Sequence, residues 1–339
     1  MTQISPLMIG FQGTEFSQDE LQFFKDVNPY GLMVMRRNVL GRNQIKRLND
    51  QFRDAVGRDD AVITTDQEGG RIQHLEGPDW PTYPIYAAFK KLIDKDFELA
   101  KQVVRRSSRA LASDMATAGF NANCGPVLDL SFAGASAVIS DRSFGERADI
   151  AAHMGEQIIA GFMESGIIPM MKHIPGHGRA AEDSHVERPV VSESLAILDN
   201  SDFLPFKTLN QCPWAMVSHV VYAACDDLPA SISKPVVDDI IRKRIGFDGV
   251  LISDCVYMQS LEGDIADRCQ QVQNAGVDLV LSCHGGAKDW YEWDEKLQPL
   301  TDDSLARLSQ AQYKMDAVVK NIDPDPHATM QDVWRILKD

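Results

Sequence analysis

Positive charge is scarce in this sequence of 339 residues. Lys and Arg together number 34 against 49 Asp and Glu, which gives a formal net charge of −15 at neutral pH. Proteins that bind nucleic acid draw their affinity from clustered Lys and Arg that neutralise phosphates. We therefore expect neither nucleic acid nor an anionic membrane as a partner.

A basic leader and long apolar runs are also missing. The opening residues, MTQISPLMIGFQGTEF, place no basic segment ahead of an apolar one. No uninterrupted apolar run approaches the roughly 18 residues of a membrane span. The simplest interpretation is a cytoplasmic protein, and we expect a monomer.

Paired cysteines and phosphate-binding loops are absent as well. Six cysteines are scattered along the chain without a CxxC pair, unlike a zinc site or a dense disulfide framework. We expect mostly free, buried thiols. Neither GxGxxG nor GxxxxGK[ST] occurs, so the Gly-Gly turn in TDQEGGR does not indicate a phosphate loop. The sequence predicts no cofactor and no bound metal.

Short apolar, strand-like runs alternate with longer helix-like segments, which favours parallel βαβ units. Helix-like spacing is clearest in FELAKQVVRRSSRALASDMATAG, SESLAILDNSDFLPFKTL and KPVVDDIIRKRIG. The predicted strands are 7–11, 32–35, 61–65, 127–130, 167–172, 214–221, 250–253 and 279–282.

Eight strands is the number of a barrel. We therefore predict an α/β fold, a single (β/α)8 TIM-type barrel covering 1–339, with a helical C-terminal tail from about residue 300. No linker rich in Pro, Ser or Gly marks a domain boundary. A doubly wound sheet is the competing architecture.

Polar motifs begin where the predicted strands end. They are TDQEGGR, LDL, MKHIPGH, VSHV, ISDC and LSCHG. In a barrel the carboxyl ends of the strands meet at one mouth, where active sites are built. The barrel interpretation therefore predicts one pocket surrounded by Asp, His and Lys.

Three charged residues are candidates for this pocket from their positions alone. Asp254 follows a buried strand, and it could be either a helix N-cap or a catalytic carboxylate. Asp66 ends another strand and could accept two sugar hydroxyl hydrogen bonds. Arg142 offers a donor fork on a loop. Asp66 and Arg142 could equally form surface ion pairs.

The segment 172-KHIPGHGRAAEDSH-185 is rich in titratable groups. Lys172 and His173 stand at a strand end and can donate to a ligand, whereas His177 fits a structural role in the bend. Asp183 can fix the tautomer of His185, which suits proton transfer. The three histidines could instead bind a metal, but proline and glycine interrupt the helix that HxxxH spacing would need.

Seven segments together resemble the β-N-acetylglucosaminidases of glycoside hydrolase family 3, in order from about residue 31 to 281. They are DQEGGR, GPVLDL, SDRSFG, KHIPGHGRAAEDSH, LPASISKP, GFDGVLISD and AGVDLVL. The resemblance implies a single barrel, retention of anomeric configuration and release of terminal β-linked N-acetylglucosamine. Bacterial cytosolic members cleave this sugar from 1,6-anhydro-N-acetylmuramic acid, with or without peptide, during peptidoglycan recycling.

The resemblance also implies roles for individual residues. Asp254 matches the nucleophile that forms a covalent glycosyl-enzyme, His185 the acid/base, and Asp183 its partner. The positions that hold the sugar are matched by Asp66, Arg142, Lys172 and His173.

Two departures from the family pattern leave alternatives open. The family has a second Asp after the nucleophile, in SDD(L/I)SM, but this chain has Cys255. His74 stands where GGRVQR ends in a substrate-contacting arginine, so it is a candidate substrate-binding residue of altered preference. A catalytically weakened sugar-binding or sensor protein, or a family 3 β-glycosidase or phosphorylase of other specificity, stays possible.

Overall fold

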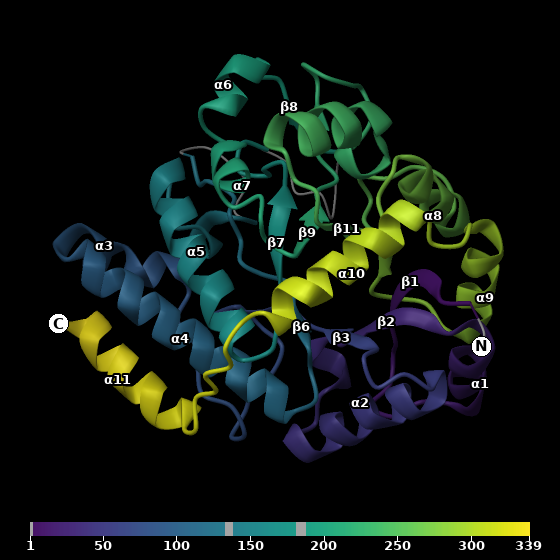
Figure 1. Ribbon diagram of the computed structural model, residues 1–339, viewed down its shortest axis with the longest axis horizontal. Coiled ribbons are helices and arrows are strands. Elements are labelled where there is room, and N and C mark those ends of the chain that lie inside the picture. The colour runs from purple at the N-terminus through teal and green to yellow at the C-terminus, as the bar shows by residue number, and fades with distance from the viewer. Residues whose placement is uncertain (1–2, 133–137, 181–187) are drawn as a thin grey trace.

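The computed structural model describes residues 3–132, 138–180 and 188–339. Its centre consists of two parallel sheets of four strands (Figure 1). In sheet order, the first contains β12 (Val280–Ser282), β1 (Ser5–Gly10), β2 (Pro29–Met33) and β3 (Val62–Thr64). The second contains β11 (Val250–Ser253), β9 (Trp214–Val217), β7 (Ile168–Ile174) and β6 (Ala122–Asn123).

Backbone hydrogen bonds cross between the two sheets at both edges. Cys124 N donates to Thr65 O at 3.1 Å on one side, and Ser253 N donates to Leu279 O at 3.1 Å on the other. A single bridge also joins Ile252 to Leu279. The predicted α/β class is confirmed, while the ladders of the described strands leave the two sheets unclosed.

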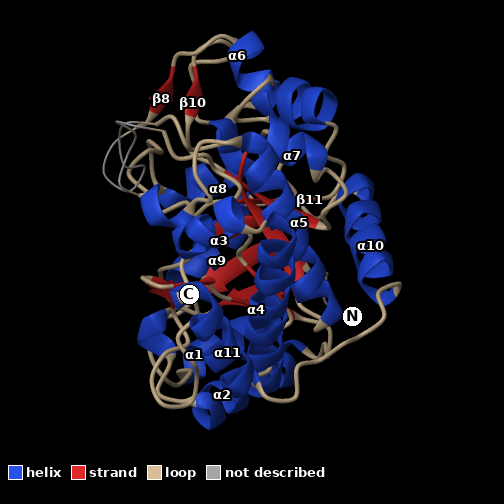
Figure 2. Ribbon diagram, turned by 90° about the vertical axis from the view of Figure 1, so that its left-hand side faces the viewer, coloured by secondary structure: helices blue, strands red, loops and turns tan. Residues whose placement is uncertain are grey.

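Helices surround the strands (Figure 2). The α-helices are α1 (Gln18–Val27), α2 (Arg42–Val56), α3 (Lys90–Lys95), α4 (Phe97–Thr117), α5 (Ala148–Glu164), α6 (Leu195–Asp199), α7 (Leu204–Thr208), α8 (Ile265–Asn274), α9 (Ala287–Lys296), α10 (Asp302–Asp316) and α11 (Pro326–Lys338). A helix with wider π turns, η5, spans Val236–Ile245. Short 3₁₀ turns are η1 (Arg36–Asn38), η2 (Tyr86–Phe89), η3 (Ser140–Arg142) and η4 (Ala230–Ile232).

Two small strand pairs lie outside the central sheets. They are the antiparallel pair β4 (Gln67–Gly69) with β5 (Ile72–Gln73) and the parallel pair β8 (Val190–Val191) with β10 (Val221–Tyr222). Among the described helices, none is long and apolar enough to cross a membrane.

Successive strand residues belong to two hydrophobic clusters. Met8, Met216 and Ile252 belong to a cluster formed mainly by strand residues of both sheets. Their neighbours Leu7 and Leu251 belong to a second, larger cluster, which also contains most of the buried hydrophobic residues of the helices. Side chains alternate between the faces of a strand. One face of each sheet therefore contributes to a shared interior, and the other face packs on the helical layer.

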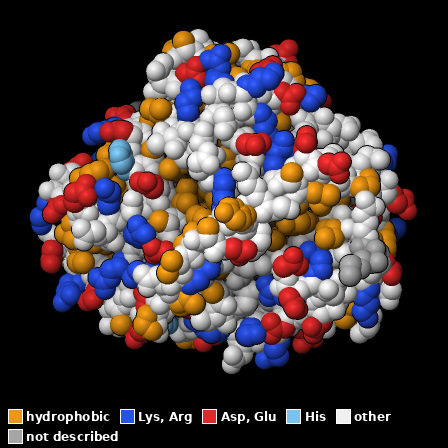
Figure 3. Space-filling model, viewed as in Figure 1, with side chains coloured by type: hydrophobic (Ala, Val, Ile, Leu, Met, Phe, Trp, Pro, Cys, Tyr) orange, Lys and Arg blue, Asp and Glu red, His pale blue; other side chains and the backbone are white. Residues whose placement is uncertain are grey.

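Helix α10 covers the side of the sheets at which the strands begin (Figure 1). A groove of about 740 Å³ beside it is lined by residues near the starts of several strands, including Tyr30, Ile168 and Trp214, and by Met315 of α10 itself. Figure 3 shows apolar side chains gathered in this hollow. The polar motifs follow the opposite, carboxyl ends of the strands.

Most predicted strands lie close to observed ones, but the predicted strand 127–130 is reduced to a single parallel bridge between Val127 and Lys172. The fourth strand of the central sheets is β6, and it ends before Gly125 and Pro126. Lys172 N donates to Pro126 O at 2.8 Å and Leu128 N donates to Lys172 O at 2.7 Å, so the segment still runs beside β7. Pro126 has no amide hydrogen to donate to the ladder, which interrupts the regular pairing.

One helix prediction also needs correction. The segment SESLAILDNSDFLPFKTL forms the two short helices α6 and α7, with Pro205 in the first turn of α7, where its missing amide hydrogen costs nothing. Beyond residue 300 the chain forms the helices α10 and α11, and α11 continues to Lys338.

Candidate functional site

Lys172 lies at the centre of a buried ion-pair network that joins two strand ends. Its Nζ atom is 2.5 Å from Asp66 Oδ1 and 2.6 Å from Glu68 Oε1, and its side chain is 2% exposed. Burial alone would lower the pKa of Lys172, but the carboxylates of Asp66 and Glu68 outweigh it and raise that pKa. Lys172 is therefore held fully charged inside the protein.

Glu68 connects this lysine to the loop that carries Arg142. The guanidinium of Arg142 donates from Nε and Nη2 to the two Glu68 oxygens, both at 2.8 Å. Burial would raise the pKa of Glu68, but Lys172 and Arg142 hold it well below its usual range. The surface ion pair considered for Arg142 is thus wrong, because the side chains of Arg142 and Glu68 are only 10% and 3% exposed.

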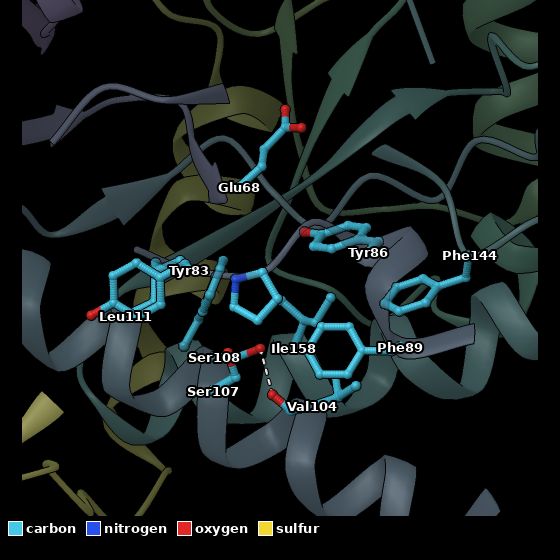
Figure 4. Close-up of a pocket in the computed structure, with 12 residues that line it drawn as sticks. Glu68, Tyr83, Tyr86, Phe89, Val104, Ser107, Ser108, Leu111, Phe144 and Ile158 are labelled. Atoms are coloured by element: carbon cyan, nitrogen blue, oxygen red, sulfur yellow. Dashed lines mark hydrogen bonds between the residues drawn. The ribbon is translucent and has the colours of Figure 1, made fainter. Parts of the chain in front are cut away.

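An aromatic floor supports Glu68 (Figure 4). Tyr86, Phe89 and Phe144 line a small cavity below it, and the Tyr86 and Phe144 rings stack with centroids 4.6 Å apart. The Glu68 carboxylate points away from these rings. Because the aromatic side chains below Glu68 are apolar, the charge of its carboxylate is compensated by the ion pairs with Lys172 and Arg142.

Asp129 holds the bend after β7. Its Oδ2 lies 2.6 Å from His173 Nδ1, and its Oδ1 accepts from the amide of His177 at 2.7 Å. Burial would raise the pKa of Asp129, but the His173 ring and these hydrogen bonds lower it. The His173 ring is therefore oriented through Nδ1, with Nε2 as its remaining polar atom.

His177 is buried at the same bend, and this burial fits the structural role predicted for the residue. Burial lowers the pKa of His177 to about 4, with a smaller contribution in the same direction from His173. A ring with this pKa is neutral at neutral pH.

Asp254 directly follows β11 and is half-buried. Its amide donates to Val217 O at 3.0 Å, and its Oδ1 accepts from the amide of Cys255 at 2.7 Å. Helix α8 begins only at Ile265 and is capped by Asp264, so the N-cap alternative for Asp254 is wrong. The carboxylate is instead fixed at a strand end.

His219 supports the backbone next to Asp254. Its Nε2 lies 3.0 Å from Cys255 O, and its Nδ1 lies 2.6 Å from Ser231 Oγ. Burial lowers the pKa of His219, although the nearby Asp254 carboxylate acts in the opposite direction. The neutral ring can therefore donate from Nε2 to the carbonyl that follows Asp254.

His74 is also positioned near this network. Its Nδ1 lies 3.1 Å from Thr65 Oγ1, and its amide donates to Asp66 O at 3.3 Å. Burial lowers the pKa of His74, although Asp66 raises it. The position therefore offers a neutral hydrogen-bonding ring, whereas arginine would offer a permanent cation.

Two predicted site residues, Asp183 and His185, lie outside the described residues. The alternative in which three histidines bind a metal includes His185, so that set of ligands also lies partly outside the described residues. Within residues 3–132, 138–180 and 188–339, no group of three or more His, Cys, Asp or Glu is arranged to hold a metal ion.

Three residues that organise the site were not singled out from the sequence. They are Glu68, Asp129 and His219. Each lies within a motif noted at a strand end, namely TDQEGGR, LDL and VSHV. A charged or titratable residue beside a predicted site residue was the available signal, but the sequence does not say which neighbours turn inward.

Comparison with known proteins gives consistent matches over most of the chain. Residues 3–320 match the family model described as glycosyl hydrolase family 3 N terminal domain. A curated β-hexosaminidase from Bordetella avium is 31% identical over 317 residues, covering 92% of this chain and 87% of that protein.

Solved structures agree with these matches. A crystal structure of NagZ from Neisseria gonorrhoeae in complex with N-trifluoroacetyl-D-glucosamine has a TM-score of 0.85 and 27% identity, covering 99% of this chain and 98% of that one. A structure of the same NagZ with zinc ion has a TM-score of 0.84 and 26% identity, with the same coverage.

Proposed function

Because this chain belongs to glycosyl hydrolase family 3, we propose that it is a retaining exo-β-N-acetylglucosaminidase. The membership confirms the resemblance noted in the sequence and the prediction of a glycoside hydrolase. The observation that carries the proposal is the half-buried Asp254 carboxylate, fixed at the end of β11 by the Cys255 amide at 2.7 Å. The curated name β-hexosaminidase supports the choice of sugar.

Asp254 acts as the nucleophile in this proposal. Retaining hydrolysis needs a carboxylate that attacks the anomeric carbon and forms a covalent glycosyl-enzyme, which water then cleaves. A strand-end residue tied through its neighbour's amide keeps a fixed position for that attack. The bond from His219 to Cys255 O restrains the same short segment.

The buried network holds the sugar. Asp66 is anchored by Lys172 through Oδ1, and its side chain is 22% exposed, so its Oδ2 can accept hydrogen bonds from sugar hydroxyls. His173, Arg142 and His74 complete the binding side of the pocket. Rigid positioning of this kind is what raises the effective concentration of the reacting groups.

Proton transfer is assigned to His185, with Asp183 as its partner. The acid protonates the leaving oxygen, and the same group then activates water as a base. Asp129 orients His173 by the same physical means, since a carboxylate at Nδ1 fixes the tautomer of the ring. The assignment of Asp183 and His185 rests on the sequence motif.

For the substrate we propose muropeptides that carry N-acetylglucosamine linked to 1,6-anhydro-N-acetylmuramic acid, with or without peptide. The ligand N-trifluoroacetyl-D-glucosamine in the Neisseria gonorrhoeae NagZ structure supports a site for 2-acylamino sugars. The cytoplasmic location and the monomeric state stay predictions.

We further propose that the two sheets are halves of one (β/α)8 barrel forming a single domain. The hydrogen bonds at both edges and the hydrophobic cluster shared by both sheets support this arrangement. In a barrel the ends of β3, β7 and β11 open on one mouth. The network around Lys172 already joins β7 to the segment after β3.

The test combines turnover with labelling. An aryl N-acetyl-β-glucosaminide should be cleaved in preference to the matching glucoside, and a 2- or 5-fluoro glycoside should leave its label on the Asp254 peptide. Asp254→Asn should lower kcat/KM by roughly 10³-fold or more. Asp227→Asn, the same change at an exposed loop aspartate, serves as the matched control and should retain activity.

Other results point elsewhere. A label on another residue contradicts the assignment of Asp254. Preference for the glucoside moves the chain to a β-glycosidase specificity, and glycosyl phosphate formed in phosphate buffer indicates a phosphorylase. Calorimetric binding of N-acetylglucosamine without turnover indicates a sugar-binding or sensor protein.

A further inference from the structure

Two cysteines lie together at the carboxyl ends of the neighbouring strands β11 and β12. The amide of Cys283 donates to Cys255 Sγ at 3.2 Å. The bond from Val256 N to Leu281 O, at 3.0 Å, holds the two segments side by side. Both thiols are free, and their residues are 8% and 7% exposed. Rotation of side chains on adjacent strand ends can bring two sulfurs to bonding distance.

We propose that Cys255 and Cys283 form a reversible disulfide when the protein meets hydrogen peroxide, and that this bond disturbs the segment holding Asp254. The proposal adds a modification site to the proposed hydrolase function. Formation of the disulfide itself does not depend on that function.

The two thiols differ in a way that suits the two steps of disulfide formation. A hydrogen bond from the Cys283 thiol lowers the pKa of Cys255, against the effect of burial. Burial instead raises the pKa of Cys212 and of Cys269 to about 12. Since the thiolate is the nucleophile, Cys255 is the thiol that attacks and Cys283 the thiol that resolves.

The reaction balances with one molecule of peroxide. The Cys255 thiolate attacks one peroxide oxygen, the O–O bond breaks, and the released hydroxide takes a proton to become water, which leaves a sulfenic acid on Cys255. The Cys283 sulfur then attacks the Cys255 sulfur and forms the S–S bond. The sulfenic hydroxyl leaves with the Cys283 proton as a second water.

The position of Cys255 connects this bond to the candidate nucleophile. Its amide donates to Asp254 Oδ1, and its carbonyl accepts from His219 Nε2 at 3.0 Å. Arg37 donates to the carbonyl of Cys283. Forming the S–S bond turns the side chain of Cys255 or Cys283 and disturbs the hydrogen bond from the Cys283 amide to Cys255 Sγ, so we expect the segment that fixes Asp254 to shift. Displacements of about 1 Å at a catalytic group cost on the order of 10²-fold in rate.

The experiment uses the full chain treated with hydrogen peroxide and then with dithiothreitol. Thiol titration should show the loss of two thiols, and peptide mapping should find Cys255 joined to Cys283. Activity on the aryl N-acetyl-β-glucosaminide should fall on the order of tenfold or more and return after reduction. Cys255→Ser and Cys283→Ser should each abolish the crosslink and the reversible loss, measured against their own untreated activity.

Cys225→Ser is the matched control, because Cys225 is more exposed than the pair and stands elsewhere in the fold. This variant should keep the full peroxide response. Absence of the Cys255 to Cys283 crosslink in the wild type overturns the proposal, and a crosslink that leaves activity unchanged overturns its effect on Asp254. If the untreated protein does not cleave the aryl glycoside, the proposed function fails while peptide mapping still decides whether the pair forms.

Discussion

Replacing Glu68 by glutamine tests the buried network directly. The change keeps the size of the side chain but removes the charge that faces both Lys172 and Arg142. Lys172 keeps only Asp66, and Arg142 loses a bidentate carboxylate while both cations stay buried. Breaking a buried ion pair from one side costs about 3 to 5 kcal/mol. We expect the free energy of unfolding at neutral pH to fall by that amount.

Urea denaturation followed by circular dichroism measures this loss. With a dependence on urea of about 3 kcal/mol per molar, the midpoint should fall by about 1 to 1.7 M. The pKa of Glu68 is lowered in the folded protein from a usual value of 4.5. Its stabilising contribution is therefore complete above about pH 4.5 and is lost as the pH falls through the lowered value. The difference between wild type and variant should shrink in acid.

Glu76→Gln provides the control for Glu68. Glu76 pairs with Arg36 at 2.7 Å on the surface, where the side chains are 48% and 52% exposed. Exposed pairs contribute about 0.2 to 1 kcal/mol, so the midpoint should fall by less than about 0.3 M. Equal shifts for Glu68→Gln and Glu76→Gln would refute the reasoning that the buried cations depend on Glu68.

Four further outcomes follow from the site. Burial lowers the pKa of His177 to about 4 from a usual value of 6.5, so the free energy of unfolding should fall as the pH drops from 6.5 to 4, and His177→Asn should weaken that dependence in urea titrations. His185→Ala should reduce turnover of natural substrates far more than of activated aryl glycosides, because only a poor leaving group needs a proton, and equal losses would deny it the acid role. His74→Arg should lower KM for the N-acetylglucosaminide by about threefold with little change in kcat, if that position binds substrate. Treatment with a chelator should leave activity unchanged, and a loss restored by zinc would contradict a metal-free site.

The general architecture could be predicted because strands and polar motifs have strong local signals. Asp66, Lys172 and Asp254 each follow an apolar run, and the structure places each at the end of a strand or just beyond it. The position of the fourth strand was predicted less accurately. Val127 begins an apolar run that is typical of a strand, but it forms only one parallel bridge, to Lys172, and Pro126 before it has no amide hydrogen to donate to the ladder.

The partners inside the site were harder to predict than the site itself. Glu68 lies two residues beyond Asp66, and nothing local indicates that it turns inward to meet a lysine more than a hundred residues away. The roles of Asp129 and His219 were equally hard to predict, since they come from contacts with other strand ends. Sequence spacing predicts which segments meet, whereas the choice of buried counter-charges is made by packing.

The bend after β7 is anchored by groups that do not belong to it. Asp129 accepts hydrogen bonds from its backbone, Tyr222 Oη donates to Gly176 O at 2.5 Å, and a side chain at Gly178 would collide with Leu130 O, which lies 1.9 Å from the Cβ position. The bend is thus fixed by contacts outside it. We therefore expect that the residues after it can be replaced by those of a relative while Lys172 and His173 keep their places, so that the proposed proton-transfer residues can be engineered separately from the proposed sugar-binding ones.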